Sequence, residues 1–183
     1  MSLSFRIRAI FLPDVLRTVA CSIVSAILDY CNSLLFGITK ANIAKLRLVQ
    51  NSLARLVTVV TDKRRFDHIS PVLADLHWLP VSHRITFKLA TLTYKTIHTS
   101  QPPYLQSAIH QYQPSRNLRS ANKNLLMLPD IRNFRSDISR RGFSNSAPTI
   151  WNNLPASVTD STISRDEFVK HLKTDLYRLA FVD

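Results

Sequence analysis

Apolar side chains recur at intervals of three or four residues along much of this chain, the spacing that places them on one face of an α-helix. The clearest example is residues 40–60, which predict an amphipathic helix. Its expected apolar face comprises Ile43, Leu46, Val49, Leu53, Leu56 and Val60. Its cations and amides are expected on the other faces: Lys45, Arg47, Gln50, Asn51 and Arg55.

Three further segments before residue 100 carry helical signals. Residues 14–29 are apolar on nearly all sides, with Val15, Val19, Ile23 and Ile27 as one stripe, and predict a helix buried on most faces. Ser70 and Pro71 suit the N-cap and first position of a short helix that stops at Leu79, before Pro80. Residues 82–98 predict another helix, with one face formed by Ile85, Leu89, Leu92 and Thr96.

The C-terminal third predicts shorter elements and one well-marked helix. Short helices are expected over residues 104–110 and from Pro148 to Pro155. Ser164 and Glu167 have the spacing of a capping box, and the helix that follows presents Phe168, Leu172, Leu176 and Leu179 to the core.

The fold class that follows is mainly α, an irregular helical bundle with residues 125–136 as the one candidate for a short β-hairpin. The chain has only two glycines in 183 residues, which disfavours hairpin-rich sheets. A polar stretch near residues 113–124 is the weak boundary between a helical core region, 1–112, and a region of loop, hairpin and C-terminal helices, 113–183. The two regions are expected to pack as one domain.

Charge is the strongest global signal. The chain carries 24 Lys and Arg against 12 Asp and Glu, a net charge of +12. Residues 41–145 hold 16 of those cations and 5 of those acids, a net charge of +11. Such an excess favours a polyanionic partner, RNA or DNA, over the alternative of a basic surface kept for solubility. No apolar run is long enough for a membrane span, so no membrane partner is predicted.

The sequence offers no local signature of catalysis. Cys21 and Cys31 form neither a disulfide framework nor a zinc motif, and no HxxxH pair or phosphate-binding glycine loop is present. No two aspartates are adjacent, and Glu167 is the one glutamate. A Ser-His-Asp set would leave no local pattern. We predict no catalytic residue, no metal, no cofactor and no enzymatic activity.

The candidate site residues are therefore cations that could contact a phosphate backbone. They are Lys45, Arg47, Arg55, Lys63, Arg64, Arg65, Arg84, Lys88, Arg116, Arg119, Arg140 and Arg141. Six aromatic side chains are candidates for stacking on bases, although each more commonly belongs to a core: Trp78, Tyr94, Tyr104, Tyr112, Phe134 and Trp151.

The stretch LDYCNSLLFG, residues 28–37, concentrates residue types found in active sites. Asp29 has no second carboxylate nearby in sequence, which disfavours metal chemistry. We interpret the stretch as a helix end and turn, in which Tyr30 packs, Asn32 and Ser33 satisfy backbone groups and Gly37 permits the reversal.

Several blocks occur in an order that resembles a known family: LDYCNSLLFG (28–37), LRLVQNSLARLV (46–57), FDHISPVLADLHWLPVSHRI (66–85), KLATLTYKTIH (88–98) and SAPTIWNNLP (146–155). Together they resemble the C-terminal region of reverse transcriptases from LINE-type (non-LTR) retrotransposons, the jockey-like group. The resemblance runs from about residue 14 to residue 180.

The resemblance implies a parent protein that copies element RNA into DNA at a nicked target site, with this region downstream of the palm and thumb. The aromatic-Ala-Asp-Asp turn of the palm has no counterpart here, so no catalytic residue carries over. What it implies is a helical appendage that holds template RNA or the RNA–DNA duplex, inside the cell and in the nucleus, beside the missing upstream polymerase domain.

Two alternatives stay open beside this interpretation. The apolar faces of residues 14–29 and 43–60 would pack against a missing thumb or, when isolated, support protein interaction or self-association. The methionine just before the first block suggests a gene model built on a truncated element, and a decayed copy would have no selected function.

Overall fold

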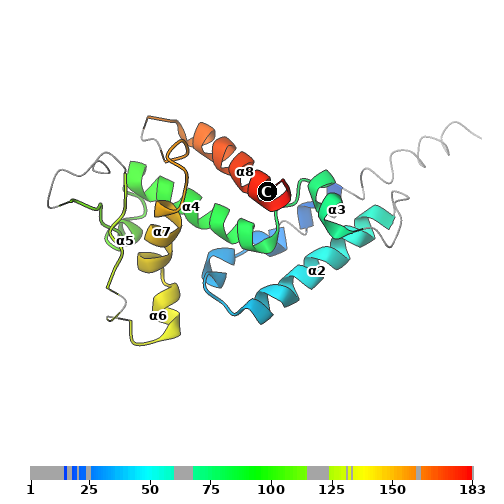
Figure 1. Ribbon diagram of the computed structural model, residues 1–183, viewed down its shortest axis with the longest axis horizontal. Helices are drawn as coiled ribbons and strands as arrows, with labels where there is room; N and C mark the ends of the chain where they lie inside the picture. The colour runs from blue at the N-terminus through cyan, green and yellow to red at the C-terminus, as the bar shows by residue number, and fades with distance from the viewer. Residues whose placement is uncertain are drawn as a thin grey trace, which may run out of the picture. The chain divides into compact units, whose positions relative to one another are not determined.

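The computed structural model is mainly α-helical, which confirms the predicted fold class (Figure 1). It describes residues 15, 18–19, 21–23, 26–59, 68–114, 124–130, 132, 134–159 and 162–182. The described residues between 15 and 29 are helical. The elements after them are the 3₁₀ helix η1 (Asn32–Leu35), α2 (Lys40–Val59), α3 (Ile69–Asp75), α4 (Val81–Thr99), α5 (Pro103–Gln106), α6 (Asp137–Arg141), α7 (Phe143–Asn152) and α8 (Arg165–Phe181).

The chain divides into two compact units, and the division falls inside α4. The first unit contains the described residues up to Tyr30, residues 38–84 and the end of the chain from Ala180. The second contains residues 31–37 and 85–179. The boundary expected near residue 113 therefore lies within the second unit.

In the first unit α2 packs against α3, and the buried stripe of α2 differs from the predicted one. Among the α2 side chains that the structure describes, those of Gln50, Ala54 and Val57 are buried, whereas Val49 is 53% exposed. The side chains of Leu56 and Val60, also predicted on the apolar face, lie outside the described set. The prediction for Gln50 was wrong because its amide has a buried partner: Nε2 donates to the carbonyl of Leu79 at 2.8 Å. This hydrogen bond satisfies a polar group that apolar spacing alone would place at the surface.

The helical segment before Tyr30 is far more exposed than its composition predicts. Val15, Val19, Ile23 and Ile27 are 54%, 49%, 53% and 68% exposed, and Leu28 is the one buried apolar side chain among the described residues there. A helix can bury all its faces only where neighbouring elements cover each of them. The described part of the first unit covers one face.

α3 is shorter and earlier than expected. Its N-cap is His68, whose Nδ1 accepts a hydrogen bond from the backbone N–H of Ser70 at 3.4 Å, so Pro71 lies within the first turn. The helix ends at Asp75, and His77 adopts a positive φ of 53°. The left-handed residue reverses the chain before Pro80 can act as the helix stop.

The core of the second unit is an aromatic cluster shared by three helices. The rings of Tyr94 in α4 and Phe168 in α8 stack at a centroid distance of 4.3 Å, and Trp151 in α7 lies 5.9 Å from Phe168. The Tyr94 hydroxyl donates to the carbonyl of Ile163 at 2.6 Å, and burial raises the pKa of that hydroxyl. Ile85, Leu89 and Thr96 are buried as predicted.

The expected hairpin within residues 125–136 is absent from the described residues there. Instead, Leu126 forms an isolated antiparallel bridge with Gln111. The N–H of Tyr112 donates to Leu125 O at 2.9 Å, and the N–H of Met127 donates to His110 O at 2.8 Å. The apolar residues 125–127 therefore pair with an extended segment, but that segment is residues 110–112, earlier in the chain, and not the following residues.

α7 begins at Phe143, five residues before the predicted start, and contains Pro148 in its interior. Asn152, at its end, grips the backbone of Leu126: Oδ1 accepts from Leu126 N–H at 2.9 Å, and Nδ2 donates to Leu126 O at 2.8 Å. Pro148 has no backbone N–H, so α7 lacks one helical hydrogen bond at that position.

The capping box of α8 is confirmed. Ser164 Oγ accepts from the Glu167 N–H at 3.3 Å, and the Glu167 carboxylate accepts from the Ser164 N–H at 2.9 Å. The two hydrogen bonds that the Glu167 carboxylate accepts, from the N–H of Ser164 and from its hydroxyl at 2.8 Å, lower the pKa of Glu167. Phe168, Leu172 and Leu176 are buried as predicted, while Leu179 is 51% exposed.

Replacing Ser164 by alanine is expected to lower the free energy of unfolding by about 1 kcal/mol, because the first turn of α8 loses its cap. Urea denaturation followed by far-ultraviolet circular dichroism measures the change. Ser157→Ala, at an exposed serine in the loop before α8, is the matched control and should leave the stability unchanged. Equal stability of S164A and S157A would contradict the capping role.

Candidate nucleic-acid interface

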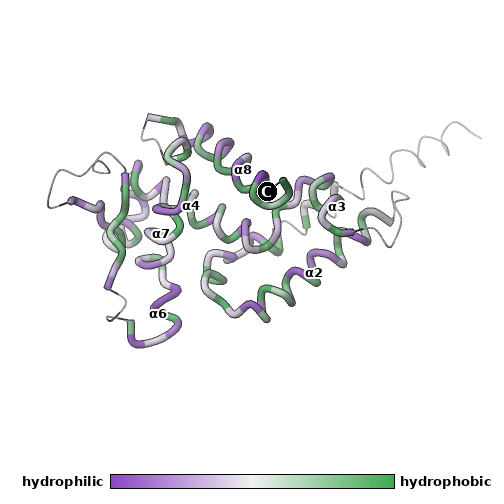
Figure 2. The backbone as a smooth tube through the Cα atoms, viewed as in Figure 1, coloured by the Kyte–Doolittle hydropathy of each residue, from purple (hydrophilic) through white to green (hydrophobic). Residues whose placement is uncertain are grey.

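The solvent-facing side of α2 carries a row of cations, which we call the α2 basic row: Lys40, Arg47 and Arg55. All three side chains are exposed, and the 20 residues of α2 include no acid. Successive members are seven and eight residues apart, which separates them by about 10–12 Å along one side of the helix. Figure 2 shows hydrophilic and hydrophobic stretches alternating along α2.

The cations at the start of the row are not neutralised by nearby carboxylates. Among the ion pairs of the described residues, none involves Lys40, Lys45 or Arg47. The pKa of His83 is lowered, mainly by burial and to a smaller extent by repulsion from the Arg47 guanidinium. Exposed cations along one helix, with Lys40 and Arg47 outside these ion pairs, are suited to a polyanion that runs along the helix.

Arg84 lies inside the first unit and not on its surface. Its Nη1 donates to both carboxylate oxygens of Asp29 at 3.0 Å, and its Nε donates to the carbonyl of Leu79 at 3.0 Å. The side chain of Arg84 is 10% exposed and that of Asp29 is 46% exposed. Contact with phosphate was the wrong prediction for Arg84, because its guanidinium already has an anionic partner.

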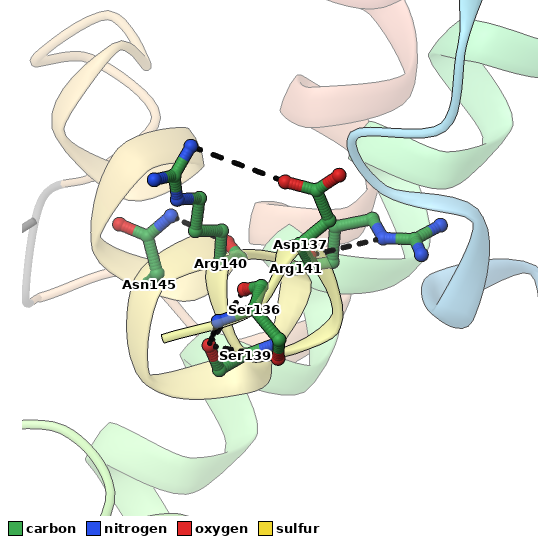
Figure 3. A network of polar contacts seen from close by, with 6 residues as sticks. All are labelled: Ser136, Asp137, Ser139, Arg140, Arg141 and Asn145. Atoms are coloured by element: carbon green, nitrogen blue, oxygen red, sulfur yellow. Dashed lines mark hydrogen bonds and ion pairs between the residues drawn. The ribbon is translucent and has the colours of Figure 1, made fainter. Parts of the chain in front are cut away.

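In the second unit, α6 presents two predicted cations in opposite directions (Figure 3). The helix is short and starts with a capping box between Ser136 and Ser139. Arg140 Nη1 lies 3.9 Å from Asp137, an exposed and loose pair, and Arg141 Nε donates to the Asp137 carbonyl at 3.2 Å. The two guanidiniums can therefore serve different parts of the surface.

Arg141 shares a hollow of about 500 Å³ with Lys95 of α4, Ser33 and Tyr104. The hollow lies beside Gly37, whose φ is +71°; a Cβ there would come within 2.9 Å of the Arg141 side chain. Two cations with hydroxyl donors form a suitable phosphate contact. Lys88, one predicted candidate on α4, is also exposed.

The other five predicted cations lie outside the described residues: Lys63, Arg64, Arg65, Arg116 and Arg119. Sequence reasoning also missed a cation at each of these two sites, Lys40 in the α2 basic row and Lys95 beside Arg141. The signal for Lys40 was present, since it precedes Arg47 by two helical turns. Lys95 lies within the predicted helix of residues 82–98, but nothing local in the sequence connects it to Arg141.

Burial separates the six aromatic candidates into two groups. Trp78, Tyr94 and Trp151 are 3%, 5% and 2% exposed and belong to the cores. Tyr104 and Tyr112 are 72% and 46% exposed, and Phe134 is half-buried. Of the six, only Tyr104, Tyr112 and Phe134 can contact a ligand without unfolding.

Residues 28–37 form the predicted turn, with one correction. Cys31 is the N-cap of η1 with a φ of 51°, and Gly37 also has a positive φ. Tyr30 was expected to pack but is 82% exposed, whereas Asn32 is buried. Asp29 serves structure, as the carboxylate that pairs with Arg84.

Comparisons with protein-family models, curated proteins and solved structures found no match. Among the described residues, no group of three His, Cys, Asp or Glu side chains is placed to hold a metal ion. No helix in the described part of the chain has the length and apolarity needed to cross a membrane.

Replacing Arg84 by alanine is expected to lower the free energy of unfolding by about 2–3 kcal/mol, less than for a fully buried pair because water reaches Asp29. Chemical denaturation measures the change. Lys88→Ala, at an exposed position one turn further along α4, is the control and should alter stability by less than about 0.5 kcal/mol. Under conditions where R84A is fully folded, it should bind nucleic acid with wild-type affinity. A weaker affinity under those conditions would indicate that Arg84 does contact nucleic acid.

Proposed function

We propose that this chain binds RNA or DNA through the phosphate backbone and has no catalytic centre of its own. The observation that carries the proposal is α2, a helix of 20 residues with exposed cations and no acid. Lys95 and Arg141 supply a second cationic position in the other unit. The net charge of +12 accords with both.

Contacts of this kind neutralise phosphates and release counterions, which gives affinity that depends strongly on salt and little on base sequence. The basic row is spaced for several phosphates along a strand and not for a single anion. The chain would therefore hold a nucleic acid in place without reading its sequence.

The proposal extends to the parent protein suggested by the sequence blocks. There the chain would be a supporting, non-catalytic region of a LINE-type reverse transcriptase, holding template RNA or the RNA–DNA duplex. The upstream polymerase domain would be its protein partner. The wording and order of the five blocks support this assignment.

Replacing Lys40 and Arg47 together by glutamine is expected to weaken binding to RNA and duplex DNA by about tenfold at low salt, because two phosphate contacts are lost. The slope of log affinity against log salt should fall in magnitude by about 2. Fluorescence anisotropy titrations at several salt concentrations measure both quantities.

The matched control removes the same charge elsewhere: Lys170→Gln with Lys173→Gln, two exposed positions on α8. Equal effects of the two double variants would assign binding to net charge and not to α2. Wild-type affinity that does not weaken between low and moderate salt would contradict the electrostatic proposal itself.

The exposed stripe of Val15, Val19, Ile23 and Ile27 favours a second candidate function, self-association. Side chains at intervals of four residues lie on one side of a helix, and each of these is about half or more exposed. Contiguous apolar surface of this kind is typical of an interaction face.

Size-exclusion chromatography with light scattering is expected to show wild-type dimers or larger species, and Ile23→Glu should shift them to monomer. Ile138→Glu, at a 75% exposed apolar position on α6, is the control and should leave the mass unchanged. A wild-type monomer at high concentration would contradict self-association.

A further inference from the structure

Two neighbouring hollows in the second unit share part of their lining, and we call them together the α7 groove. One hollow, of about 400 Å³, is lined in part by Phe134, Arg140 and Asn153. The other, of about 760 Å³, is lined in part by Tyr112 and Met127. Leu128 and Asn152 line both hollows, so the two lie side by side.

Hydrogen bonds, in addition to apolar contacts, fix the wall of the groove in position. Asn152 binds both backbone groups of Leu126, and Trp151 Nε1 donates to the carbonyl of Asn124 at 2.6 Å. The bridge between Gln111 and Leu126 joins the second strand-like segment to the first. The extended segments that carry Tyr112 and Met127 are thus attached to α7.

The chemistry of the lining is a combination of aromatic, cationic and amide groups. Tyr112 and Phe134 supply aromatic rings, one in each hollow, and Arg140 supplies a guanidinium. The Nδ2 groups of Asn145 and Asn153 donate to backbone carbonyls of α6 and α7. The Oδ1 atom of each side chain is the group that accepts hydrogen bonds. None of the described lining residues is acidic.

Among the described residues, two carboxylates adjoin lining residues of the groove in the sequence, and neither of them lines it. Asp137 is 3.9 Å from Arg140 in an exposed pair, which a phosphate could replace. Asp130 follows Pro129, and its Oδ1 accepts a hydrogen bond from the backbone N–H of Arg132 at 3.0 Å. Figure 3 shows Arg140 directed away from Arg141, which faces the separate hollow beside Gly37.

We propose that the α7 groove binds single-stranded nucleic acid, with unpaired bases stacked on Tyr112 and Phe134 and Arg140 on the backbone. Ring faces tolerate every base, and a cation beside them follows the strand, which is the usual combination in single-strand binding. Paired bases are stacked within their own helix and cannot enter such hollows. The inference rests on the proposed function and names the form of nucleic acid that this surface selects.

The test compares a fluorescein-labelled ten-nucleotide single strand, as RNA and as DNA, with a duplex of the same length, using the full chain. Tyr112→Leu and Phe134→Leu should each weaken single-strand binding by about fivefold to tenfold, the loss of one stacked base, and leave duplex binding unchanged. Tyr30→Leu, at an 82% exposed tyrosine outside the groove, is the matched control and should change neither.

A second readout separates stacking from a general structural effect. An oligonucleotide containing 2-aminopurine should lose fluorescence when the wild-type chain binds it, and should lose less when Y112L binds it. Because Tyr112 is partly exposed, a smaller loss with Y112L would not be explained by misfolding. Circular dichroism checks the fold of both variants.

The possible failures are distinguishable. Binding of neither single strand nor duplex by wild type would overturn the proposed function and this inference together. Binding of both forms, with Y112L and F134L at wild-type affinity and quenching, would overturn the groove while leaving phosphate binding by α2 in place.

Discussion

The first unit depends on a single carbonyl group, that of Leu79. It accepts hydrogen bonds from Gln50 Nε2 on α2 at 2.8 Å and from Arg84 Nε on α4 at 3.0 Å. Arg84 in turn holds Asp29, at the end of the first helical segment. Because Leu79 is buried and precedes a proline, its carbonyl lies outside any helix and requires partners from elsewhere. The arrangement connects three helical segments through polar groups in a largely apolar interior.

This network also accounts for how the charges of the chain are distributed. A buried guanidinium is tolerated because Asp29 and a carbonyl compensate for its lost hydration. The cations of α2, in contrast, are exposed at the surface. The proposed phosphate contacts draw on exposed cations, on α2 and elsewhere, so the same residue type performs two tasks that only burial distinguishes.

The aromatic residues divide in the same way. Tyr94, Trp151 and Phe168 stack in the interior of the second unit, and Trp151 uses its indole N–H to hold the segment at Asn124. That segment carries one wall of the α7 groove, where Tyr112 and Phe134 line the hollows. Core packing therefore positions the surface that we propose for unpaired bases, and the two groups of rings are linked through α7.

Much of this structure follows from local sequence, because helix periodicity and capping depend on interactions between residues that are close in the chain. The ranges of α2 and α4, the capping box of Ser164 and Glu167, and the exposure of Arg47 and Lys88 are all of this kind. The tertiary structure decided what depends on distant partners. Gln50 and Arg84 are buried because Leu79 and Asp29 compensate for them, and residues 125–127 pair with 110–112 because Asn152 holds Leu126 in place. Periodicity measures how apolar a face is, but only three-dimensional packing determines whether anything covers it, as the exposed stripe before Tyr30 shows.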